Sequence, residues 1–131
     1  MANLTDRTID LEPAVLTAVE QQSDRVVLVF PSQPSYSEQS TLVPHFTCQM
    51  RISRGVIERN DAVLPLETDE WRVEYLAGSR QCFLPIGFAA EGPVRVTFWQ
   101  RNVPKLIVEG DRFEFIVGAQ VASHAIERRN D

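Results

Sequence analysis

The sequence contains few of the residues that mark metal-binding, disulfide-bonded or membrane-spanning proteins. Its 131 residues include two cysteines, Cys48 and Cys82, and two histidines, His45 and His124. Neither pair has the short spacing of a metal-binding motif, and two distant thiols do not indicate a disulfide framework. No run approaches the roughly 18 apolar residues that a membrane helix requires. We therefore expect no metal, no cofactor and no membrane partner.

Lysine is nearly absent, and acidic residues outnumber basic ones. Lys105 is the single lysine among 13 basic residues, and the net charge is −5. An acidic protein lacks the positive field that attracts phosphate groups, so this balance disfavours nucleic acid as the main partner. The polar N-terminal stretch has no apolar segment typical of a secretory signal. Together with the distant thiols, this predicts a soluble, cytoplasmic protein.

Hydrophobic residues make up 44% of the chain, which is enough for a packed core. The length suits one domain with a sizeable core and is too short for two. We predict a single domain over 1–131, in which an N-terminal extension (1–44) precedes a β-barrel (45–127).

The N-terminal extension is predicted to contain a short helix, a strand and a polar loop. Asp10 is a suitable N-cap, and the apolar residues of 11–22 share one helical face. A strand over 14–20 remains open, because β-branched residues alternate there. The β-rich run 25–30 predicts a buried strand, and the Pro- and Ser-rich segment 31–44 predicts a polar loop. Three interpretations of this loop remain open: a mobile segment, a contact arm, or the junction with the barrel.

From His45 onward, apolar and polar residues alternate, which is typical of half-buried strands. The first alternating run is 45–53, which ends at a turn signal in Arg54 and Gly55. The segments 71–75 and 94–98 show the same period of two. These runs predict strands whose apolar residues share one inner face.

The last third of the chain contains the strongest turn signals. A turn is predicted at 109–111, and two further strands, 112–117 and 121–126, flank Gly118. Gly118 is expected to adopt the positive φ of a tight closing hairpin. About eight short strands in one small chain predict an all-β fold, a small closed antiparallel barrel with a short N-terminal helix.

Residues 45–127 resemble the C-terminal β-barrel, or third domain, of the translational GTPase elongation factor Tu. The strand 71–75 keeps an aromatic-Arg-x-polar-aromatic pattern of that domain, and Gly92 and Pro93 lead into a strand in a similar way. The final segment keeps the family's order of glycine and hydrophobic positions at Gly110, Phe113, Phe115, Gly118, Val121, Ala122, His124 and Ile126.

This resemblance implies a barrel fold without the family's GTPase activity. The chain has no phosphate-binding loop of the GxxxxGK[ST] type. The family's final hairpin is basic and approaches tRNA, whereas the corresponding tip here, 116–120, carries no charge. The resemblance therefore extends to the fold more than to tRNA binding.

No catalytic motif is present in the sequence. His45 and His124 are each expected to be half-exposed strand histidines without a ligand role. The alternative is that His124 pairs with a carboxylate as an acid–base unit. Cys48 is expected in the core, and Cys82 belongs to no nucleophile motif. The carboxylate pairs flank predicted turns, where acidic residues are usually solvated. We therefore expect that the protein is not an enzyme.

The most informative polar residues lie on the outward face of the strand that begins at 94. Arg95 and Arg101 flank Trp99, and an aromatic ring between guanidinium groups can stack on a base or anchor a protein interface. The alternative is that Trp99 packs under the N-terminal helix and that the arginines are ordinary surface charges. With a second patch and the predicted hairpin tip, the candidate binding surface comprises Arg95, Trp99, Arg101, Arg72, Gly118 and Gln120.

We expect a non-catalytic soluble binding module that recognises a protein partner. An accessory or immunity-type protein linked to a toxin or a translation component fits this description. One alternative is an RNA- or tRNA-binding module that uses the Arg/Trp strand face. Another is a structural or assembly subunit of an oligomeric particle, in which 31–44 exchanges between copies.

Overall fold

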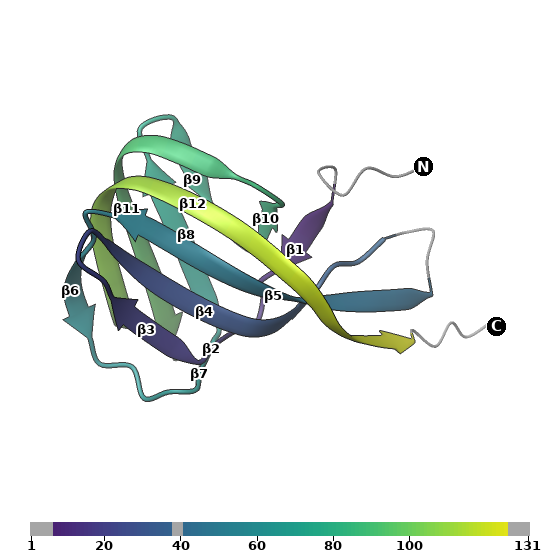
Figure 1. The fold of residues 1–131 in the computed structure, drawn as a ribbon. Coiled ribbons are helices and arrows are strands. Elements are labelled where there is room, and N and C mark those ends of the chain that lie inside the picture. The colour runs from purple at the N-terminus through teal and green to yellow at the C-terminus, as the bar shows by residue number, and fades with distance from the viewer. Residues whose placement is uncertain (1–6, 38–40, 126–131) are drawn as a thin grey trace.

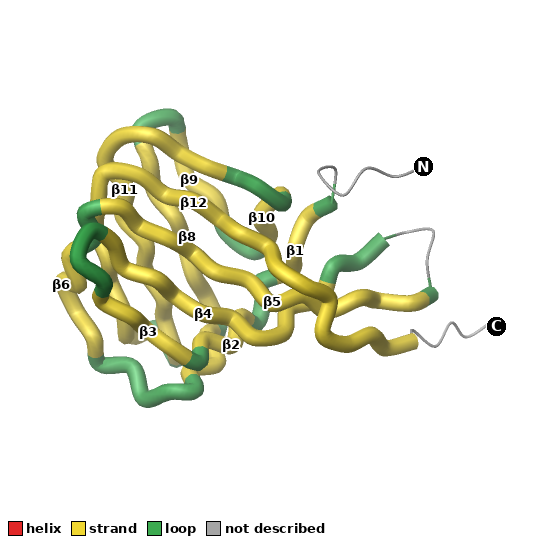
Figure 2. Tube along the Cα trace, in the orientation of Figure 1, coloured by secondary structure: helices red, strands yellow, loops and turns green. Residues whose placement is uncertain are grey.

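The computed structural model describes residues 7–37 and 41–125, and within these ranges the chain forms strands and no helix (Figure 1, Figure 2). The strands are β1 (Thr8–Asp10), β2 (Ala14–Leu16), β3 (Ala18–Gln21), β4 (Arg25–Pro34), β5 (Leu42–Ser53), β6 (Val56–Asn60), β7 (Leu66–Thr68), β8 (Glu70–Tyr75), β9 (Gly78–Arg80), β10 (Phe83–Pro85), β11 (Ala89–Gln100) and β12 (Val103–Ala125). The pairs that they form are antiparallel. The predicted all-β class is confirmed.

Most of the strands form one sheet with the order β3-β4-β5-β12-β11-β8-β9, in which β6 also pairs with β12. Within the described ranges the end strands β3 and β9 do not pair with each other, so the predicted closed barrel is wrong. The first two strands lie outside this sheet. β1 pairs with β10, and β2 pairs with β7, so that each pair forms a small sheet. At the β3 side, the Thr17 N–H donates to the Val29 carbonyl of β4. The segment that contains β2 and β3 thus joins β7 to β4.

The helix predicted over 11–22 is also wrong, and the segment instead contains β2 and β3, as the alternative over 14–20 suggested. Leu16 enters the core from β2, and the Val15 N–H donates to Oε1 of Gln33 at 2.9 Å. Pairing with β4 and β7 satisfies backbone groups that a helix would have satisfied internally. The apolar residues of this segment fit the period of a helix and that of a strand. Pairing with β4 and β7 selects the strand.

The strand β12 is 23 residues long and continuous, so the turn predicted at 109–111 and the hairpin predicted at Gly118 are wrong. Its first half pairs with β11 and β6, and its second half pairs with β5. The register shifts between Val117 and Gln120 and again between Gln120 and Ala122. These bulges lie in the half of β12 that pairs with β5, and such irregularities bend a strand and increase its local twist.

One hydrophobic core joins the N-terminal strands to the rest of the chain. Phe30 of β4 lies against Phe98 of β11, with ring centroids 5.9 Å apart, and Trp71 of β8 is buried in the same cluster. The inward residues predicted for 45–53 and 94–98 are buried, which confirms those strands and their apolar faces. The N-terminal contribution to this core comprises Ile9, Leu11, Ala14, Leu16, Val26, Leu28 and Phe30.

Two strand ends project from the body of the protein. Figure 1 shows the start of β5 and the end of β12 running out together, away from the other strands. We refer to these residues, 42–46 and 118–125, as the arm. The predicted loop 31–44 is shorter than expected, because β4 continues to Pro34 and β5 begins at Leu42. Its central part, 38–40, lies outside the described residues.

Candidate binding surfaces

The outward residues of β11 lie on a face shared with β8, β12 and β6. Arg72, Thr97 and Ile107 stand directly opposite one another on β8, β11 and β12. Thr97 and Ile107 are only 4% and 8% exposed, whereas Val56, which stands opposite Glu109 on β6, is 58% exposed. We refer to it as the Arg/Trp face, after Arg72, Arg95 and Trp99.

The structure brings Arg72, Arg95 and Trp99 onto the Arg/Trp face, but it also pairs both arginines with carboxylates. Arg95 Nη1 lies 3.1 Å from Glu109 Oε1, and Arg72 Nη2 lies 3.7 Å from Glu70 Oε1. The Arg72 guanidinium is 5.8 Å from the centre of the Trp99 ring, within the range of a cation–π contact. The ring therefore lies beside a cation of its own chain, and the positive charges are locally balanced.

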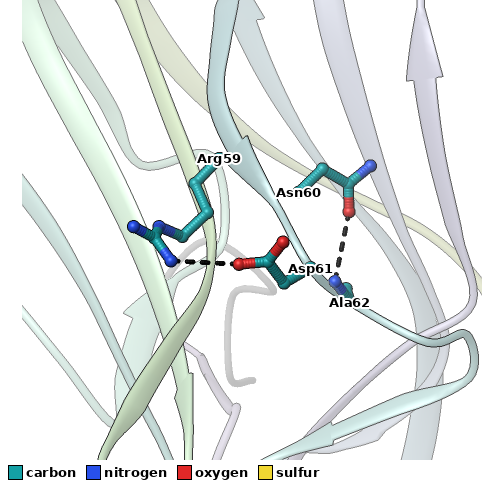
Figure 3. Close-up of polar contacts among 4 residues, drawn as sticks. All are labelled: Arg59, Asn60, Asp61 and Ala62. Atoms are coloured by element: carbon teal, nitrogen blue, oxygen red, sulfur yellow. Dashed lines mark hydrogen bonds and ion pairs between the residues drawn. The ribbon is translucent and has the colours of Figure 1, made fainter.

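Charge balance continues to the end of β6, at the margin of the Arg/Trp face. Figure 3 shows the Arg59 guanidinium against Asp61, with Nη1 3.0 Å from Oδ2. Beside it, the Ala62 N–H donates to Oδ1 of Asn60, which shapes the chain where β6 ends. Arg59 stands opposite Ile107 and therefore borders the Arg/Trp face. Because Asp61 balances its charge, Arg59 adds no net positive charge to that face. The face as a whole lacks the excess of positive charge that phosphate binding requires.

Arg101 lies apart from the other arginines. It occupies the turn between β11 and β12 with a φ of 52°, and its N–H donates to Asp69 Oδ2 at 2.8 Å. The side chain lines an open hollow of about 430 Å³ together with Glu12, Glu67 and Asp69. Because carboxylates surround it, Arg101 is poorly placed for contact with nucleic acid.

Gly118 and Gln120 lie on the arm rather than in a hairpin tip. Gly118 sits within β12, where an added Cβ would come 2.7 Å from Thr47 Cγ2. Gln120 stands opposite Phe46 between the two bulges and is exposed. The role of Gly118 is thus to permit a close approach of β5 to β12, since its φ is not positive.

The arm exposes an uncharged strand. Every residue of 118–125 is exposed, and none carries a formal charge at neutral pH when His124 is neutral. Large hydrophobic side chains gather nearby: Val121 is 54% exposed, Leu42 59% and Tyr36 50%. On the side of β12 opposite β5, the Phe115 N–H donates to the Phe88 carbonyl, and no strand of the described residues pairs beyond that point.

The two histidines of the chain meet at the arm, although 79 residues separate them. His45 Nε2 lies 2.6 Å from His124 Nδ1, and the ring centroids are 4.8 Å apart. Ser32 Oγ lies 3.3 Å from His45 Nδ1, and Tyr36 makes an edge contact with the His124 ring. Partial burial, followed by repulsion from His124, lowers the pKa of His45. When both rings are neutral, one of these two nitrogens can donate its N–H to the other.

Both histidines lie on strands, as expected, and the structure also brings their rings into contact. His45 stands opposite Ala122, and His124 stands opposite Val43, so the two rings are diagonal neighbours on adjacent strands. No local spacing in the sequence predicts this contact. It depends on the register between β5 and β12, which the bulges after Val117 set.

The thiols occupy environments that keep them protonated. Cys48 is buried in the core as predicted, and burial raises its pKa to about 12. Cys82 is half-buried with a φ of 70°, and it is a free thiol, as is Cys48. A hydrogen bond with Glu12, then burial and the negative charges of Glu12, Asp10 and Glu70, raise the pKa of Cys82 to about 11. A nucleophilic thiol needs the opposite shift.

Comparison with known proteins finds no counterpart: no family model matches the chain, and no curated protein or solved structure matches it at a significant level. The resemblance to elongation factor Tu stays a prediction, although the closing hairpin that carried part of it is absent from β12. Within 7–37 and 41–125, the chain has no helix of the length and apolarity needed to cross a membrane.

Proposed function

We propose that the protein is a non-catalytic binding module that accepts an extended segment of a partner protein along the outer edge of the arm. An exposed strand edge offers unpaired backbone groups, and a partner strand can pair with them to extend the sheet. The single observation that carries this proposal is the uncharged, exposed edge at 118–125.

The other edges of the large sheet differ from the arm in length and charge. β3, β6 and β9 have 4, 5 and 3 residues, and each carries at least one charged side chain. Short edges and charged side chains protect a sheet from pairing with another chain. The arm lacks both protections, which supports it as the docking element.

Exposed hydrophobic side chains provide the second element of recognition. Val121 and Leu42 are more than half exposed, and Tyr36 is half exposed. In strand addition, backbone hydrogen bonds supply affinity, and contacts to alternate side chains supply specificity. A partner strand with apolar residues at alternate positions fits this surface.

The RNA-binding alternative receives less support from the surface charges. Arg72 and Arg95 are paired with glutamates, and Arg101 lies among carboxylates. The alternative of an assembly subunit would use the same strand edge, with a second copy of the chain as the occupant.

The experiment begins with a photo-crosslinking residue at Val121, which should capture the partner in native lysate. The purified partner is then titrated with the protein and with Val121→Lys, which places a charge on the edge. We expect Val121→Lys to weaken binding about tenfold or more, as for a residue central to an interface. The matched control is Val56→Lys on β6, since Val56 is 58% exposed against 54% for Val121.

Equal affinity of the two lysine variants would contradict the proposal, as would hydrogen-exchange protection on the Arg/Trp face instead of 118–125. Light scattering identifies the occupant. A mass of 14.8 kDa for the purified chain supports a separate partner. A doubled mass that Val121→Lys returns to the monomer value would establish the assembly alternative in its place.

A further inference from the structure

His124 lies within the proposed docking edge 118–125, and its ring meets that of His45 in a geometry suited to paired ligands. We propose that His45 and His124 form a two-ligand site for a divalent transition-metal ion of the type that imidazole favours, such as Zn²⁺, Ni²⁺ or Cu²⁺. The metal would join the start of β5 to the end of β12 across the arm. This inference does not depend on the proposed function.

The ring nitrogens are already placed to share one ion. His45 Nε2 and His124 Nδ1 lie 2.6 Å apart, and both rings belong to paired strands. Two imidazole nitrogens bound to one tetrahedral zinc at about 2.0–2.1 Å stand about 3.3–3.4 Å from each other. The pair must therefore open by about 0.7–0.8 Å, which rotations of the two surface rings can supply.

Ser32 orients the His45 ring for metal binding. A histidine that binds metal through one nitrogen usually donates its other N–H to an oxygen, which fixes the tautomer. Ser32 Oγ lies 3.3 Å from His45 Nδ1, on the far side of the ring from His124. If Nδ1 carries the proton, Nε2 presents its lone pair toward His124 and the proposed ion.

The site supplies two protein ligands and leaves the other coordination positions open. No group of three or more His, Cys, Asp or Glu side chains suited to a metal occurs within 7–37 and 41–125. Water, or the histidine pair of a second copy, would complete a tetrahedral shell. We therefore expect lower affinity than a structural zinc site with four protein ligands has.

The test is a titration of the 131-residue protein with Zn²⁺. Calorimetry and NMR of the histidine side chains monitor the binding. We expect one saturable site whose binding shifts the imidazole resonances of both histidines, and no such response to Mg²⁺, which imidazole does not favour. His45→Gln and His124→Gln should each weaken Zn²⁺ binding about tenfold or more, and Ser32→Ala should weaken it by about tenfold.

The control is Cys82→Ser, which removes the more accessible thiol and should leave Zn²⁺ affinity unchanged. Unfolding midpoints measured with a chelator present should agree among the variants, which shows that each one folds. Undiminished binding in both histidine variants, or its loss in Cys82→Ser, would overturn the proposal. One ion per two chains with a doubled mass would support it and would add the second copy's histidines to the shell.

Discussion

At the scale of single residues, the surroundings of a side chain decide its chemistry more than its identity does. Cys48 and Cys82 are both free thiols, and both have raised pKa values for different reasons. Cys48 is desolvated in the core. Cys82 stands beside the carboxylate of Glu12, which holds its proton and opposes the negative charge of a thiolate. The half-buried thiol is therefore less reactive than its exposure alone suggests.

Cys82 should react slowly with alkylating reagents, and Glu12→Gln should accelerate the reaction. With the pKa of the thiol at about 11, the thiolate fraction at a pH of about 8 is on the order of one in a thousand. Removing the carboxylate charge lowers the pKa, so the thiolate fraction rises. We expect an increase of about tenfold in the rate of iodoacetamide labelling, measured by mass spectrometry of the peptide that contains Cys82.

The matched control for this experiment is Glu58→Gln, which removes an exposed carboxylate from β6. It should leave the labelling rate of Cys82 unchanged. If Glu12→Gln labels no faster than the unmodified protein, Glu12 does not control the thiol.

At the scale of elements, β12 determines the architecture. It replaces the predicted turn and hairpin by one strand that pairs with β11 along 103–114, with β6 along 106–109 and with β5 along 112–125. Gly110 lies at the crossing point, where β5 turns into β6 through Arg54 and Gly55. An added Cβ at Gly110 would meet Cγ2 of Ile52 and would stand 2.5 Å from the Ser53 carbonyl oxygen. Glycine is required there for close approach, not for a turn.

Gly110→Ala should destabilise the fold by about 1–3 kcal/mol, because overpacking against a backbone carbonyl forces the strands apart. The comparison variant is Gly118→Ala, where the nearest atom belongs to the Thr47 side chain. A side chain can rotate away more easily than a backbone can shift, so its cost should be smaller. Urea unfolding of both variants measures the two free energies, and a larger loss for Gly118→Ala would contradict this account.

At the scale of the whole molecule, a single core makes the N-terminal strands and the later strands interdependent. Phe30 and Phe98 are both fully buried, and they meet across this core from β4 and β11. The segment before β5 is therefore packed into the same hydrophobic cluster as the rest of the chain. A loss of packing at this contact should weaken the fold as a unit.

Phe98→Ala should lower the free energy of unfolding by about 3–5 kcal/mol, the usual cost of removing a buried phenyl ring. Phe83→Ala provides the control, since Phe83 is 52% exposed and should change stability by less than about 1 kcal/mol. Fluorescence and circular dichroism should report one common transition for each protein. Separate transitions for the N-terminal strands would contradict a shared core.

Alternation in the sequence was sufficient to predict the strands that have one buried face. In 45–53 and 94–98, each apolar residue lies two positions from the next, and the structure buries these residues as predicted. The segment 11–22 was ambiguous because its apolar residues suit either period, and contacts with β4 and β7 settled it. Of the candidate residues, Arg72 and Trp99 contact each other. Glu70 lies two positions from Arg72 on the same strand, so that ion pair follows from local alternation, whereas Glu109 reaches Arg95 only through the pairing of β11 with β12.

The sequence by itself determined the all-β class, because the side-chain period of a strand follows from its local geometry. Only the tertiary structure decided that the sheet stays open, that β12 continues through Gly110 and Gly118, and that His45 meets His124. These features depend on register, and a shift of one residue turns each later side chain to the opposite face. Register is set by pairing between distant segments and by the bulges of β12, so it becomes visible only when the strands are placed side by side.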